Sequence, residues 1–155
     1  MDDIIRGVAL ILENDESEIL ILQEFQSKPH FGKYAGMFSI PMETSEPGEP
    51  DISALDRLVS EELVVMDPRH LDIQERYVGR YQIVKNVWVS LYVKRATGVI
   101  TLPQSKNGGE VGNHRWITPQ KAYALWLRRG AFEMLSDYIS GRSGVTCEYC
   151  APSPS

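Results

Sequence analysis

The chain has 155 residues, of which 43% are apolar and 24% are charged, a composition typical of one compact globular domain. Its formal net charge of −5 disfavours a protein that binds long nucleic acid by neutralising phosphates. The sequence has neither a basic N-terminal region followed by an apolar stretch nor a run of about 18 apolar residues, so we expect a cytoplasmic protein with no membrane partner.

The first third of the chain is predicted to form strands. Apolar runs favour strands over residues 8–12 and 19–23, joined by a tight turn at 14–17. A loop with the aromatic residues Phe31 and Tyr34 follows, and these two either cover the core or stack on a base. A further short strand is expected within residues 37–41, ahead of an acidic loop.

The clearest helical pattern covers residues 51–65. Pro50 and Asp51 are start signals, and Asp67-Pro68 is a stop signal. The apolar stripe recurs at steps of three or four residues and consists of Ile52, Leu55, Val59 and Leu63.

Charged residues on this helix suggest a metal site. Leu58, Glu61 and Glu62 share one face, because positions three and four apart are neighbours on a helix. Two adjacent carboxylates repel each other, and a hard divalent ion with oxygen ligands is one remedy. Arg57 stands eight residues after Glu49 and is able to bridge the helix to the acidic loop. The plainer alternative is a solvated helix face with one ion pair.

The second half of the chain alternates strand and helix signals. A strand over residues 83–93 has apolar residues on both faces, which indicates a central position in a sheet. Residues 95–109 form an irregular loop, and a late strand follows at about residues 110–117. Thr118 and Pro119 then start a helix. That helix is expected to carry Ala122, Leu125 and Trp126, and a last helix has its apolar stripe at Phe132, Leu135, Tyr138 and Ile139.

The last residues, 142–155, have little apolar content, so we predict a flexible C-terminal tail. Cys147 and Cys150 are interpreted as unpaired tail thiols. A zinc ion shared between two tails, or a redox pair, is the alternative.

The acidic loop and the helix together resemble the Nudix box of the Nudix hydrolase (MutT-like) family. That box reads glycine, five residues, glutamate, seven residues, arginine, glutamate, an apolar residue, any residue, two glutamates, any residue, glycine and an apolar residue. The matching positions are Glu49, Arg57, Val59, Glu61, Glu62 and Val65. The departures are Glu43 and Val64, where the family has glycine, and Leu58, where it has glutamate. The resemblance extends over about residues 4–140, in the family's order of elements.

The resemblance implies a Nudix-type α/β/α sandwich with a mixed, curved sheet over residues 1–141. It also implies a hydrolase that cleaves a nucleoside diphosphate linked to another moiety, with a small nucleotide or other diphosphate as substrate. Glu61 and Glu62 would bind Mg²⁺ (or Mn²⁺), and the catalytic set would be Glu49, Arg57 and Glu62. A homodimer is compatible with this assignment.

Leu58 is unable to bind a metal or activate water, so two hypotheses from different classes remain. In the first, the chain is an active hydrolase with reduced or rewired activity, in which Glu43 or Glu110 replaces the missing carboxylate. In the second, it is a catalytically inactive Nudix-fold module with a nucleotide-binding or regulatory role. A buried Leu58 with Glu43 turned to solvent favours the second hypothesis, and a replacement carboxylate near Glu61 and Glu62 favours the first.

Overall fold

The computed structural model describes residues 3–62, 76–96, 102, 109–148 and 150, except for the side chains of Glu61 and Glu62. In chain order its elements are β1 (Ile5–Glu13), β2 (Ile19–Glu24), the 3-10 helix η1 (Pro29–Phe31), β3 (Phe38–Ser39), β4 (Met42–Thr44), α1 (Asp51–Glu62), β5 (Arg76–Val84), β6 (Val87–Arg95), β7 (Val111–Ile117), α2 (Pro119–Tyr123), α3 (Ala131–Ile139) and β8 (Val145–Cys147).

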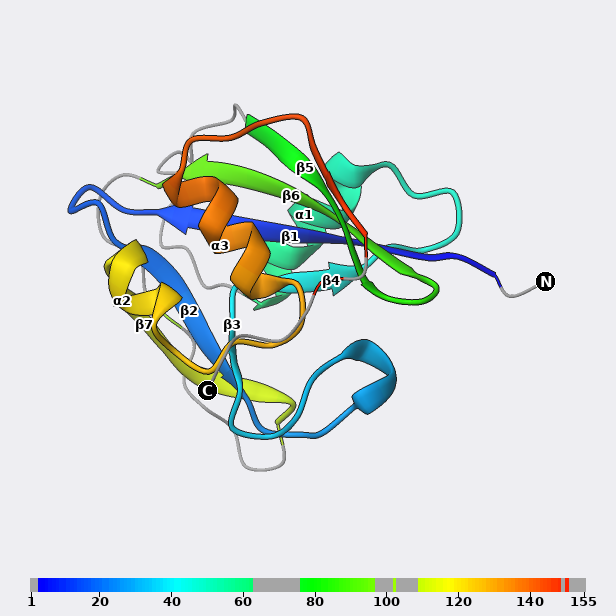
Figure 1. Ribbon diagram of the computed structural model, residues 1–155, viewed down its shortest axis with the longest axis horizontal. Coiled ribbons are helices and arrows are strands. Elements are labelled where there is room, and N and C mark those ends of the chain that lie inside the picture. The colour runs from blue at the N-terminus through cyan, green and yellow to red at the C-terminus, as the bar shows by residue number, and fades with distance from the viewer. Residues whose placement is uncertain (1–2, 63–75, 97–101, 103–108, 149, 151–155) are drawn as a thin grey trace.

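The strands of the described residues form one mixed, curved sheet (Figure 1). Its main order is β3-β2-β1-β6-β5-β8, with β4 also paired to β1 and β7 paired to β2. The β1–β6 and β5–β8 pairs are parallel, whereas the other pairs are antiparallel. The predicted mixed sheet is therefore confirmed.

The sheet lies between α1 on one face and α3 on the other (Figure 1). Successive side chains of a strand point to opposite faces, and the buried middle of β1 shows this directly. Val8, Leu10 and Leu12 pack with the α1 residues Ala54, Leu55 and Leu58. Ala9 and Ile11 belong to the cluster that contains Ala131, Met134 and Leu135 of α3. The predicted three-layer arrangement is confirmed.

The strand predicted over residues 83–93 is wrong, because the chain reverses within it. Lys85 and Asn86 form a two-residue turn between β5 and β6, and Val84 pairs with Val87. Valines on both sides of the turn made the apolar run look continuous, although Asn is a common residue of such tight hairpin turns. The central position holds for β6, which lies between β1 and β5.

The buried face of α1 also differs from the predicted stripe. Ile52 is 53% exposed, whereas Leu58 is completely buried. The helix packs on β1 and β4 through Ala54, Leu55 and Leu58, with Val59 partly buried beside them. The sheet thus covers the face of α1 that carries Leu58, and positions 63–65 of the predicted helix lie outside the described residues.

Two features near the C-terminus differ from expectation. Helix α2 ends at Tyr123, so Leu125 and Trp126 lie beyond it, and Trp126 is 42% exposed. Val145–Cys147, in the segment expected to be a flexible tail, adds β8 to the sheet beside β5. Cys150 is buried, and its Sγ lies 2.9 Å from that of Cys147. Residues 151–155 lie outside the described part of the chain.

Candidate functional site

Arg57 on α1 holds the loop that connects β4 to the helix. Its Nη1 donates to Glu43 Oε1 at 2.8 Å, and its Nη2 donates to Glu49 Oε1 at 2.7 Å and to the carbonyl oxygen of Thr44 at 3.0 Å. A guanidinium group has several donors in a fixed plane, which allows one side chain to bind several acceptors in this way. We call the three residues Glu43, Glu49 and Arg57 the arginine clamp.

Glu49 and Arg57 stabilise each other's charged forms. The hydrogen bond from Arg57 lowers the pKa of Glu49, and the backbone N–H of Glu46, which donates to Glu49 Oε1 at 2.9 Å, acts in the same direction. The hydrogen bond to Glu49 in turn raises the pKa of Arg57. The bridge from the helix to the acidic loop is thus present, and it includes Glu43 at the position where the Nudix box has glycine.

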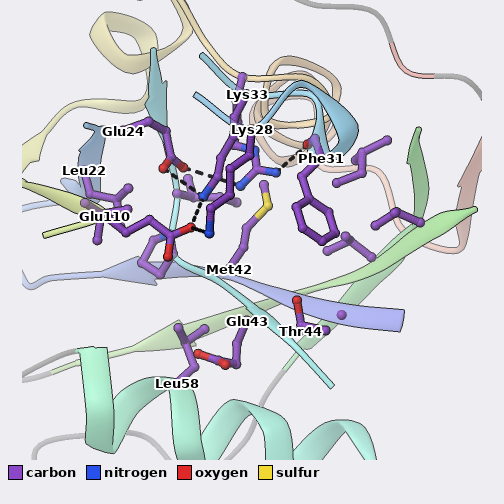
Figure 2. Close-up of a pocket in the computed structure, with 18 of the residues that line it drawn as sticks. Leu22, Glu24, Lys28, Phe31, Lys33, Met42, Glu43, Thr44, Leu58 and Glu110 are labelled. Atoms are coloured by element: carbon purple, nitrogen blue, oxygen red, sulfur yellow. Dashed lines mark hydrogen bonds and ion pairs between the residues drawn. The ribbon is translucent and has the colours of Figure 1, made fainter. Parts of the chain in front are cut away.

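A pocket of about 450 Å³ lies beside the arginine clamp. Figure 2 shows Glu43, Thr44 and Leu58 at the end of the pocket nearest α1, and Glu24, Lys28, Lys33 and Glu110 at the opposite end. The rest of the lining is largely apolar and includes Leu22, Phe31, Ile40, Met42 and Val89. Phe31, which was left open between core cover and base stacking, lies on the pocket wall, whereas Tyr34 is 48% exposed and is not part of the lining.

The floor of the pocket depends on a close approach between β1 and β4. A Cβ atom added to Gly7 would lie 2.8 Å from the carbonyl oxygen of Glu43, a distance that real Cβ atoms do not tolerate. Gly7 pairs with Thr44, and Val8 with Glu43, in the antiparallel ladder between the two strands. Glycine at this position therefore allows β4 to deliver Glu43 and Thr44 to the pocket.

The far end of the pocket carries a network of three cations and two carboxylates. Lys33 Nζ binds Glu110 Oε1 at 2.6 Å and Glu24 Oε2 at 3.2 Å, and Lys28 Nζ binds the same Glu110 oxygen at 2.8 Å. Arg128 Nη1 binds Glu24 Oε1 at 3.4 Å, and its Nη2 donates to the carbonyl oxygen of Phe31 at 2.8 Å. We call these five residues the cationic network.

The members of this network differ in exposure. The side chains of Glu24, Lys33 and Arg128 are 2%, 7% and 7% exposed, whereas those of Lys28 and Glu110 are 34% and 44% exposed. Burial lowers the pKa of Arg128, with the charge of Glu24 opposing that shift. Hydrogen bonds from Lys28 and Lys33 lower the pKa of Glu110 to about 2, so its carboxylate is ionised at neutral pH.

His114 also lines the pocket, and its imidazole is neutral. Both ring nitrogens are buried without a hydrogen-bond partner among the described residues, and burial lowers the pKa of the ring. A neutral ring offers one donor and one acceptor to a ligand in the pocket.

The structure brings together some of the residues predicted for the site. Glu49 and Arg57 meet directly, whereas Glu110 lies across the pocket from α1 and is paired with the two lysines. Glu61 and Glu62 are the last residues of α1, and their side chains lie outside the described part. No group of three or more His, Cys, Asp or Glu side chains that would hold a metal ion occurs among the described residues.

Sequence reasoning named Glu110 as a candidate metal ligand but missed the cationic network to which it belongs. Its members lie at positions 24, 28, 33, 110 and 128, and no local spacing links them. The one available signal was Glu24, a charged residue at the end of the mostly apolar strand β2, because a buried carboxylate needs a cationic partner. Which cations supply that partner depends on tertiary structure.

Comparison with known proteins agrees with the fold and the order of elements. The NUDIX domain model matches residues 3–138. No curated protein sequence matches significantly. Among solved structures, the E. coli ORF135 protein is similar with a TM-score of 0.62 and 22% identity, over 89% of this chain and 90% of that one.

Two further solved structures with the same fold are described by a nucleotide substrate or a nucleotide ligand. A C. elegans Ap4A hydrolase, solved as a binary complex, is 18% identical with a TM-score of 0.63, over 89% of this chain and 97% of its own. The NUDIX domain of Shewanella oneidensis NrtR, complexed with ADP ribose, is 11% identical with a TM-score of 0.60, over 91% of this chain and 90% of that one. No helix in the described residues is long and apolar enough to cross a bilayer. The match over residues 3–138 shows that this chain belongs to the Nudix family.

Proposed function

We propose that this chain is a divalent-metal-dependent hydrolase that cleaves a nucleoside diphosphate linked to another moiety. The observation that carries the proposal is the pocket itself, which begins at the arginine clamp beside α1 and ends at the cationic network. A diphosphate compound carries negative charge, which the cations at one end of the pocket attract. In this proposal its phosphate bond is cleaved at the other end, beside helix α1 of the Nudix box.

The proposed metal ion, Mg²⁺ or Mn²⁺, requires oxygen ligands near that helix. Positions 61 and 62 follow pocket-lining Leu58 by three and four residues, the spacing of neighbouring positions on one face of a helix. Glu43 adds a carboxylate from β4 to the end of the pocket nearest α1, although its Oε1 already accepts a hydrogen bond from Arg57. The donor set thus fits a hard cation in chemical type, and Leu58 leaves it one carboxylate short of the family's pattern.

In this proposal Glu61 and Glu62 hold the metal ion. The ion would neutralise charge on the phosphate oxygens and lower the pKa of a bound water. Arg57 and Glu49 act by fixing the loop against the helix. Apolar side chains such as Leu22 and Met42 keep water away from the bound ligand, and Lys28 and Lys33 attract its negative charge.

A second function, a Nudix-fold module that binds a nucleotide without hydrolysing it, is favoured by Leu58. This side chain is completely buried in the cluster between β1 and α1, in the box position where the family has a metal-binding glutamate. Glu43 is not turned to solvent, since it is only 19% exposed and bound to Arg57, so this part of the pattern favours neither function.

One experiment separates the two functions. Purified protein is incubated with a panel of nucleoside diphosphate derivatives while Mg²⁺ or Mn²⁺ is titrated, and the released phosphomonoester is measured through a coupled phosphatase. The hydrolase proposal predicts metal-dependent release from at least one compound. Nucleotide binding without release under any metal condition would support the module instead.

A further inference from the structure

The Glu110 carboxylate has an unusual position, because one of its oxygens joins two lysines that would otherwise repel each other. Lys28 and Lys33 form an isolated antiparallel bridge across η1, and like charges directly opposite each other in a ladder are destabilising. Both ammonium groups converge on Glu110 Oε1, at 2.8 and 2.6 Å. A single carboxylate oxygen therefore compensates both lysine charges at the two ends of this loop.

The charge of the cationic network is unbalanced. Three cations face two carboxylates, and two of those cations, Lys33 and Arg128, are more than nine-tenths buried. The network therefore carries a net positive charge, which attracts a further negative group. The buried Nε of Arg128 also has no acceptor among the described residues, which shows that this wall is not fully satisfied by the protein's own groups.

The two carboxylates of the network have different freedom to move. Glu24 is 2% exposed and is held between Lys33 and Arg128, so it belongs to the fixed wall. Glu110 is 44% exposed and precedes β7 at the rim of the pocket. Glu110 is therefore the more accessible of the two carboxylates to displacement by a ligand group with negatively charged oxygens.

We propose that Lys28, Lys33 and Arg128 form a binding site for an oxyanion of the ligand, a phosphate or a carboxylate, and that Glu110 occupies this site as an internal competitor in the free protein. The inference rests on the proposed function in one respect: the oxyanion belongs to the end of the ligand remote from α1. The apolar part of the lining, which includes Leu22, Ile40 and Met42, suits an apolar or planar body that carries this group.

An internal competitor reduces apparent affinity, because only the fraction of molecules with an open site binds the ligand. Replacing Glu110 by Gln keeps the size of the side chain and removes its charge. Glu110→Gln should therefore bind an oxyanion ligand more tightly than the native chain. This expectation is opposite to that for a glutamate that holds a metal ion or activates water, whose replacement lowers activity and gives no gain in metal-free binding.

The test is calorimetry on the full chain in EDTA, with phenyl phosphate as the probe and phenol as its uncharged counterpart. We expect Glu110→Gln to bind phenyl phosphate at least about tenfold more tightly than the native chain, and Lys28→Met to bind it at least about tenfold more weakly. Phenol binding should change in neither variant. Benzoate in place of phenyl phosphate distinguishes a carboxylate site from a phosphate site.

The matched controls are Glu16→Gln in the β1–β2 turn and Lys121→Met in α2, which remove the same charges from exposed positions outside the pocket. Both should leave binding unchanged. The proposal is overturned if Glu110→Gln binds phenyl phosphate no more tightly than the native chain, or if Lys28→Met binds it equally well. Because the assay contains no metal and measures no turnover, its outcome is independent of whether the chain is a hydrolase.

Discussion

Glu43 Oε1 accepts a hydrogen bond from Arg57 Nη1 at 2.8 Å, in a box position where the Nudix family has glycine. Glu43 therefore adds a further acceptor for Arg57, which also donates to Glu49 and to the carbonyl oxygen of Thr44. A carboxylate in this ion pair is a poorer replacement for the missing metal ligand than a free one, because binding a metal requires it to share or leave Arg57. This relationship explains why Leu58 and Glu43 have to be tested together.

Two substitutions of Arg57 separate the effect of its positive charge from the effect of its several planar hydrogen-bond donors. Arg57→Lys keeps the charge and loses the planar donors that reach Glu43, Glu49 and Thr44 at once, whereas Arg57→Ala loses both. We expect hydrolysis to fall in both variants, and more in Arg57→Ala, with only a small fall in melting temperature because the clamp is partly exposed. Thermal unfolding and the phosphate-release assay measure the two effects. Equal activity in all three proteins would show that the clamp has no role in turnover.

Leu58→Glu should restore a carboxylate and lower stability at the same time. Leu58 is completely buried, so the substitution loses burial worth about 1.5–3 kcal/mol. A metal ion that binds the new carboxylate stabilises the folded state by mass action. We therefore expect Mg²⁺ to raise the melting temperature of Leu58→Glu more than that of the native chain, and to raise its hydrolysis.

Leu58→Gln is the control for this substitution, since it introduces a polar side chain of the same size without charge. It should lose stability and gain no response to Mg²⁺. Glu43→Gly combined with Leu58→Glu restores both box positions and is the fuller test. A folded double mutant with no gain on any nucleotide diphosphate would favour the binding module.

The pKa of Glu110 predicts how stability depends on pH. In the folded protein this pKa falls from its ordinary 4.5 to about 2, mainly because Lys28 and Lys33 donate to the carboxylate. A lowered folded pKa contributes stability above pH 4.5 that is lost as the pH falls towards about 2. The native chain should thus be more stable than Glu110→Gln at neutral pH, and the difference should narrow below pH 4.5. Chemical unfolding at several pH values measures it, and a constant difference would show that the ion pairs do not form in solution.

The backbone conformation of Gly32 is expected to hold Lys33 in its place in the cationic network. Its φ of +71° lies in the left-handed region, and an added Cβ would lie 2.8 Å from Arg129 Cβ. Gly32→Ala should cost about 1–2 kcal/mol from the backbone alone, and it should displace Lys33 and weaken binding of phenyl phosphate. Gly48→Ala is a useful comparison, because Gly48 has a similar φ of +76° and nothing within 4 Å of its added Cβ. Gly48→Ala should lose stability without a change in phenyl phosphate binding.

Local sequence patterns predicted much of the fold. The apolar runs of β1 and β2, the cap formed by Thr118 and the order of strands and helices are local properties, and they gave the three-layer arrangement. The hairpin at Lys85 and Asn86 was missed because valines flank the turn on both sides. The exposure of Ile52 was missed because helical spacing alone does not say which face of α1 meets the sheet.

Less of the candidate site was predicted from the sequence, because many of its contacts join residues that are far apart along the chain. Glu49 and Arg57 are eight residues apart, so their spacing was informative and their contact is observed. Lys33 and Glu110 are 77 residues apart, and only the folded sheet brings them together. The resemblance to the family suggested that Glu110 replaces a metal ligand, whereas the folded chain pairs it with Lys28 and Lys33.

The most direct test of the proposed hydrolase is the dependence of turnover on Glu61 and Glu62. Native protein, Glu61→Gln, Glu62→Gln and the control Asp56→Asn, an exposed carboxylate on the same helix, are compared on the most active nucleotide diphosphate while Mg²⁺ is titrated. We predict that each glutamate variant loses at least about 10–100-fold in activity, as expected when a metal site is weakened, and that Asp56→Asn keeps native activity. Robust metal-independent hydrolysis, or hydrolysis insensitive to both glutamate substitutions, would contradict the account.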